Sequence, residues 1–124
     1  MGGGRGSCRP RRVPPRRGRR PALNRGAVYD VELSGGSRPV VVLTRDRAIS
    51  ILANVTVAAV TGTVRGLPTE VPVGTREGFT RDAVVNCDNL FTIPKASLGR
   101  RRGALGPEAI DRLRTALMIA LELD

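Results

Sequence analysis

The chain has 124 residues, a mass of 13.2 kDa and 40% hydrophobic side chains, which is enough for one hydrophobic core and excludes a multidomain enzyme. It contains no histidine, and this excludes histidine-based catalytic triads, histidine-ligated zinc and the usual general base near neutral pH. The formal net charge of +10 makes nucleic acid a candidate partner.

Most of the positive charge lies in the first 24 residues. They hold eight arginines and no acidic residue, which leaves 13 of the 21 basic and all 11 acidic residues for 25–124, a net charge of +2 there. The Gly, Pro and Arg content of residues 1–24, without hydrophobic periodicity, predicts disorder. This tail is interpreted as an arm that binds polyanions, as a solvated tail, or as the product of a start codon assigned too far upstream. A claim that the domain 25–124 binds RNA must therefore rest on a site.

The two cysteines, Cys8 and Cys87, form neither a disulfide framework nor a metal-binding motif, which favours a reducing, cytoplasmic location. The longest apolar stretch, 51–60, is well below the ~20 residues that span a bilayer, and no signal peptide is apparent. We expect a cytoplasmic protein with no bound metal, no cofactor and no membrane partner.

The first predicted elements after the tail are three strands. Residues 27–33 largely alternate between apolar and polar side chains and end at a tight turn, 34–36. The β-branched runs 40–44 and 52–61 predict central strands, joined by the polar loop 45–47.

Three shorter strands are predicted next. Residues 69–73 contain Pro72, which is typical of an edge strand, and the segments 83–87 and 90–93 flank an Asp-Asn pair interpreted as a turn.

The C-terminal segment changes to helical periodicity. Pro107 suits a first helical turn, and apolar side chains recur at helical spacing at Ile110, Leu113, Leu117 and Leu121. Five to six short strands followed by one amphipathic helix predict a mainly β fold, a small, strongly curved barrel with the helix packed on it.

Three polar residues at strand ends form a candidate catalytic site: Arg38 before the second strand, Thr61 at the end of the third, and Asp88 between the last two. With no histidine and only eleven acidic residues, places where a guanidinium, a hydroxyl and a carboxylate meet at strand ends are the candidates for chemistry. Each also has a plain structural interpretation, respectively a surface ion pair, a strand-end hydroxyl and a turn residue.

The same residues lie in six blocks that, in this order, resemble the MazF/PemK (Kid-like) toxin family of type II toxin–antitoxin modules. The blocks are Arg25-Gly26-Ala27-Val28-Tyr29, Arg38-Pro39-Val40-Val41-Val42, Val57-Ala58-Ala59-Val60-Thr61, Asp82-Ala83-Val84-Val85, residues 88–95 and residues 98–108.

The resemblance implies an SH3-like barrel with a C-terminal helix, a homodimer, an antitoxin partner that blocks the site, and a metal-independent endoribonuclease acting on single-stranded RNA. It places the catalytic arginine on Arg38, the catalytic threonine on Thr61 and an acid/base carboxylate on Asp88. The polar residues expected to bind RNA beside them are Ser37, Thr63, Arg65 and Asn89.

The sequence also departs from the family pattern. The loop 34–37 is short and lacks an acidic residue, which puts RNA recognition by that loop in question. Phe91 stands where an arginine is expected and is either a core residue or a base-stacking platform. The run 100–102 of three arginines either meets phosphate or is a solvated basic run.

Such an enzyme needs no histidine, because the RNA 2′-hydroxyl is the nucleophile and yields a 2′,3′-cyclic phosphate and a 5′-hydroxyl. Arg38 would stabilise charge on the phosphoryl oxygens, and Thr61 would hold one of them or orient the 2′-hydroxyl. The base is a perturbed Asp88 or Arg38, or catalysis relies on positioning and electrostatics. Two alternatives are a nonenzymatic toxin of this fold that inhibits DNA gyrase and an RNA-binding SH3-like module.

Overall fold

The computed structural model describes residues 23–123, and the predicted disordered tail lies almost entirely outside them, so that expectation stays a prediction. The elements along the chain are β1 (Ala27–Leu33), β2 (Gly36–Val42), α1 (Asp46–Ile49), β3 (Asn54–Thr61), β4 (Glu70–Val73), the 3-10 turn η1 (Thr75–Glu77), β5 (Ala83–Pro94), the 3-10 turn η2 (Lys95–Ser97), β6 (Leu98–Ala104) and α2 (Pro107–Leu121).

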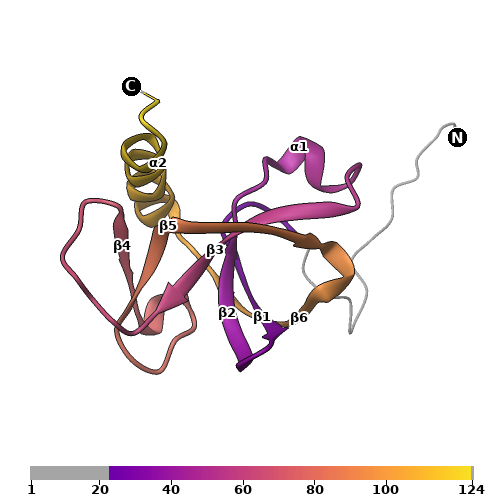
Figure 1. Cartoon of the computed structure of the whole chain (residues 1–124), viewed down its shortest axis with the longest axis horizontal. Coiled ribbons are helices and arrows are strands. Elements are labelled where there is room, and N and C mark those ends of the chain that lie inside the picture. Colours follow the sequence, from indigo (N-terminus) through magenta and orange to yellow (C-terminus); the bar gives the residue numbers. More distant parts are fainter. Residues whose placement is uncertain (1–22, 124) are drawn as a thin grey trace, which may run out of the picture.

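The strands form one antiparallel sheet in the order β4-β5-β3-β2-β1-β6, and the sheet curls strongly around the centre of the molecule (Figure 1). The mainly β fold with a C-terminal helix is thus confirmed. The barrel stays open, because the edge strands β4 and β6 form no ladder with each other in the described part of the chain. Helix α2 packs against β4 and β5.

Strands β5 and β6 and the connection between β2 and β3 differ from what the sequence predicts. The segments predicted as two strands around Asp88 form the single strand β5, because a bulge accommodates the polar pair without ending the strand. Strand β6, Leu-Gly-Arg-Arg-Arg-Gly-Ala, was not expected because it lacks apolar alternation, and it forms by pairing with β1. The loop 45–47 includes the start of the short helix α1.

The core has two parts, one on each face of the curled sheet, because alternate residues of a strand point to opposite faces. The first part lies between the sheet and α2 and includes Val28, Val41, Ala58, Val85 and Leu113. The second part includes Val31, Val40, Val42, Val55, Val57 and Ile49 of α1. Phe91 packs against this second cluster, which supports the core interpretation of that residue.

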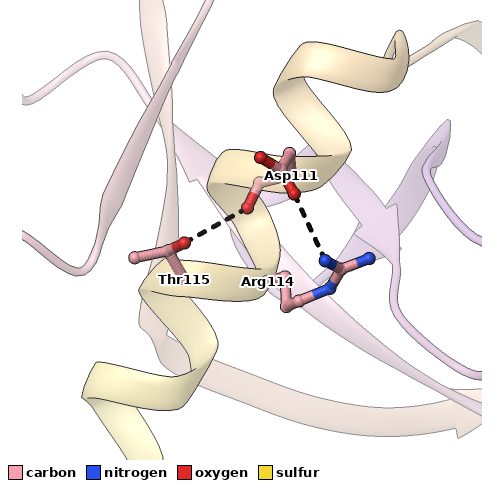
Figure 2. Close-up of polar contacts among 3 residues, drawn as sticks. All are labelled: Asp111, Arg114 and Thr115. Atoms are coloured by element: carbon pink, nitrogen blue, oxygen red, sulfur yellow. Dashed lines mark hydrogen bonds and ion pairs between the residues drawn. The ribbon is translucent and has the colours of Figure 1, made fainter.

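Helix α2 is amphipathic as expected. Its buried residues are Ala109, Leu113 and Ala116, and Pro107 stands in its first turn. On its outer face, Arg114 pairs with Asp111 at 3.3 Å (Figure 2). Both side chains are at least 70% exposed, so this pair stabilises the helix little. Within residues 23–123, no helix has the length and apolar character needed to cross a membrane.

A close backbone crossing connects η1 to β6. A Cβ atom added at Gly78, where φ is +99°, would lie 2.4 Å from the Arg102 carbonyl oxygen, and one added at Gly103 would lie 2.4 Å from the Glu77 carbonyl oxygen. Because glycine has no Cβ atom, only glycine at both positions permits these two backbone segments to approach this closely.

Candidate active site

A pocket of about 230 Å³ lies at the C-terminal end of β3. Its lining residues come from β2, β3, the following loop, β4 and β5: Arg38, Ala59, Val60, Thr61, Thr63, Arg65, Glu70, Asn86 and Asn89. The structure therefore brings together five of the seven predicted site residues. Ser37 and Asp88 are not among the residues that line this pocket.

The pairing of β2 with β3 explains why Arg38 and Thr61 meet. Val40 is the register partner of Ala59. Arg38 lies two residues before Val40, and Thr61 lies two residues after Ala59. Because side chains two residues apart in a strand share a face, both polar side chains continue the same row at the same end of the sheet. Arg38 is exposed, so its guanidinium is accessible to a ligand.

The hydroxyl of Thr61 is oriented by the loop that follows it. The backbone N–H of Thr63 donates a hydrogen bond to Thr61 Oγ1 at 3.1 Å. Since the oxygen accepts here, the hydroxyl proton of Thr61 is free to be donated to another group, such as a phosphate oxygen.

A three-residue bulge in β5 forms the side of the pocket that β5 contributes. The β3 neighbours Ala58 and Ala59 pair with Leu90 and Asn86, so the three β5 residues 87–89 have no register partners on β3. Such bulges redirect side chains and are frequent beside active sites. Here Asn86 directly precedes the bulge and Asn89 is its last residue, and both line the pocket.

Asp88 is exposed and engaged outside the pocket lining. Its Oδ2 accepts a hydrogen bond of 2.5 Å from the Thr69 hydroxyl, and its backbone N–H donates to Asn86 Oδ1 at 3.0 Å. The carboxylate thus ties β5 to the residue just before β4.

The neighbouring Cys87 is buried, and burial raises the pKa of its thiol from 9.0 to about 11, with a further contribution from the Asp88 carboxylate. The thiol is therefore protonated at neutral pH and is not a nucleophile.

Glu70 and Asn86 are pocket residues that the sequence analysis missed. The half-buried Glu70 carboxylate accepts hydrogen bonds from the backbone N–H groups of Arg65, Gly66 and Leu67. An acidic residue at the start of a short strand is a weak signal, because only the fold of the preceding loop brings it into the pocket.

The arginine run 100–102 is not uniform. Arg102 Nη1 pairs with Asp30 Oδ1 of β1 at 3.2 Å, and its guanidinium carbon lies 5.1 Å from the centre of the Phe79 ring. Both charged side chains are less than one-third exposed. Arg102 is therefore a structural residue, whereas Arg100 is exposed.

Replacing Arg102 with alanine should lower the free energy of unfolding by about 1–2 kcal/mol, because an ion pair and a cation–π contact are both lost. Since Arg102 is not among the pocket residues, the activity of the folded variant should stay close to wild type. Urea denaturation and a cleavage assay check the two expectations. A variant as stable as wild type would show that Arg102 does not stabilise the fold.

The fold and the pocket together define a small, mainly β protein with a C-terminal helix and a polar pocket that contains Arg38, Thr61 and Arg65. The profile of the family described as PemK-like, MazF-like toxin of type II toxin-antitoxin system matches residues 24–121. The chain belongs to this family.

Individual relatives agree with this assignment. Endoribonuclease MazF3 of Mycobacterium tuberculosis is 48% identical over 88 residues, which cover 71% of this chain and 85% of the relative. The structure of the Mycobacterium tuberculosis toxin MazF-mt6 superimposes with a TM-score of 0.74 at 44% identity, covering 79% of this chain and 98% of the other. An endoribonuclease from a mycobacterial species, solved in complex with its cognate antitoxin, has a TM-score of 0.76 at 33% identity, covering 83% and 98% of the two chains.

Proposed function

We propose that this chain is the toxin of a type II toxin–antitoxin system and an endoribonuclease that cleaves single-stranded RNA without a bound metal. The observation that supports this most directly is the pocket that joins Arg38 to Thr61, in a family whose relatives are named endoribonucleases. Its partners are then RNA, a cognate antitoxin and a second copy of the chain, in the cytoplasm.

In the proposed reaction, the RNA 2′-oxygen forms a bond to phosphorus while the bond from phosphorus to the 5′-oxygen breaks. The 2′-hydroxyl loses its proton, and the departing 5′-oxygen gains one, so the products are a 2′,3′-cyclic phosphate and a 5′-hydroxyl. Arg38 donates hydrogen bonds to the phosphoryl oxygens, on which negative charge develops. Thr61 donates a hydrogen bond through its hydroxyl group to one of these oxygens or orients the 2′-hydroxyl.

Three other polar residues of the pocket hold the flanking RNA. Arg65 provides a second cation for a phosphate, and the side-chain amides of Asn86 and Asn89 offer donors and acceptors to a base or sugar. Ser37 lies next to Arg38 on the exposed end of β2. The acid/base role of Asp88 stays a prediction, because its carboxylate accepts from Thr69 in this structure.

The test is to incubate a long single-stranded RNA with the purified protein in EDTA and to identify the new ends. We expect cleavage at defined positions, with a cyclic phosphate on one product and a 5′-hydroxyl on the other. RNA that stays intact with and without Mg²⁺ would contradict the proposal and favour a gyrase inhibitor or an RNA-binding module. Cleavage that stops in EDTA would contradict metal independence.

A further inference from the structure

The loop 62–69, between β3 and β4, forms one side of the pocket. It contributes Thr63 and Arg65 to the lining, while Val64 and Leu67 are 60% and 43% exposed. The loop contains no helix or strand. One backbone hydrogen bond, from Glu70 N–H to the Leu67 carbonyl oxygen at 3.1 Å, closes its end, and the shape of the part before it depends on the side chains that bind its backbone.

One carboxylate gathers the central part of this loop. Glu70 Oε1 accepts from the backbone N–H of Arg65 at 3.1 Å, of Gly66 at 3.0 Å and of Leu67 at 3.3 Å, and Oε2 also accepts from Arg65 at 3.3 Å. The turn requires a glycine, because φ at Gly66 is +74°. Hydrogen bonds from N–H groups to a carboxylate are stronger than those to a neutral acceptor.

Both ends of the loop are fixed as well. At the first end, Thr63 donates to the Thr61 hydroxyl oxygen. At the second end, the buried Thr69 donates a hydrogen bond from its hydroxyl group to the Asp88 carboxylate, and its carbonyl oxygen accepts one from Cys87 N–H at 3.0 Å. With both ends fixed on the sheet, the Glu70 hydrogen bonds determine where the middle of the loop, including Arg65, lies.

We infer that Glu70 is a positioning residue of the RNA site, which holds the backbone of the loop so that Arg65 is already in place to bind a phosphate. The inference rests on the proposed function. Glu70 is not assigned to proton transfer, because its carboxylate oxygens already accept from backbone donors. The two arginines of the pocket, Arg38 and Arg65, are the groups that can bind phosphate.

A double-mutant cycle tests this role. An RNA oligonucleotide that the wild-type protein cleaves is the substrate for Glu70→Gln, Arg65→Ala and the double variant. Glu70→Gln should lower kcat/KM by about tenfold, mainly through a higher KM, because RNA binding must then order the loop. If Glu70 acts through Arg65, the double variant should be no worse than Arg65→Ala alone.

Glu77→Gln is the matched control. Glu77 Oε1 accepts from Gly74 N–H at 2.7 Å, so it also binds a turn through a backbone donor, but it does not line this pocket. Its kcat/KM should stay within about twofold of wild type, and its combination with Arg65→Ala should be additive. An unchanged KM for Glu70→Gln, or additive losses with Arg65→Ala, would overturn the inference.

A second variant perturbs the loop and leaves Glu70 in place. Gly66→Ala strains a positive φ without meeting any atom within 4 Å, so it should raise KM as Glu70→Gln does. Amide hydrogen exchange provides a readout that needs no activity: Glu70→Gln should speed exchange at residues 65–67 and leave the core strands protected. Unchanged exchange there would overturn the positioning role, whereas a wild-type protein that cuts no RNA would contradict only the proposed function.

Discussion

Replacing Arg38 with alanine is expected to lower kcat/KM for RNA cleavage by about 10²–10³-fold, the loss typical for removing one donor that stabilises charge in the transition state. The loss should appear mainly in kcat, because the charge on the phosphoryl oxygens grows as the new bond forms. Arg38 is exposed and makes no ion pair among the described residues, so the fold should be unaffected.

The measurement is single-turnover cleavage, with circular dichroism and thermal unfolding to verify the fold. Arg47→Ala is a suitable control, because Arg47 is an exposed arginine of α1 outside the pocket and its loss changes the net charge equally. Near-normal cleavage by a folded Arg38→Ala protein would show that the chemistry occurs elsewhere. Arg38→Lys should recover only part of the rate, because an ammonium group cannot form the bidentate contact.

Replacing Gly78 with alanine should lower the free energy of unfolding by about 3–4 kcal/mol. Two effects add at this position. The positive φ strains any residue with a Cβ, and that Cβ would lie 2.4 Å from the backbone oxygen of Arg102, which is not the flexible end of a side chain. The crossing must open to accommodate it.

Equilibrium denaturation of Gly78→Ala, Gly103→Ala and Gly106→Ala checks this expectation. Gly103→Ala should also be destabilised but by less than Gly78→Ala, because Gly103 faces the same crossing without a positive φ. Gly106, the N-cap of α2, has no atom within 4 Å of its added Cβ, so its substitution should cost less than about 1 kcal/mol. A Gly78→Ala protein as stable as the Gly106 variant would mean that the two backbones are not in close contact.

The structure confirms the predicted strands whose own side chains are apolar and β-branched, because such side chains favour burial in a sheet. The β-branched runs 40–44 and 52–61 lie largely in the central strands β2 and β3, and the register of these strands explains why Arg38 and Thr61 share a pocket. Strand β6 was not predicted, because its sequence lacks apolar alternation and it forms through its pairing with β1.

The site was only partly predictable for a related reason. The bulge at residues 87–89 depends on how β5 registers against β3, and this register is a property of two strands and not of one segment. The roles of Glu70 and Asn86 depend in turn on the loop and the bulge that bring them to the pocket. A polar side chain at a strand end can be recognised in a sequence, whereas a carboxylate that organises a neighbouring backbone cannot.

The crossing of Gly78 and Gly103 also has a consequence for how the molecule opens. The turn η1 directly follows the edge strand β4, and β6 is the opposite edge of the same sheet (Figure 1). The crossing, together with Arg102 above Phe79, therefore connects the two edges although no ladder joins β4 to β6 within residues 23–123. Edge strands ordinarily fray independently, but here neither edge can detach without releasing the other, so local opening of this small domain becomes a cooperative event.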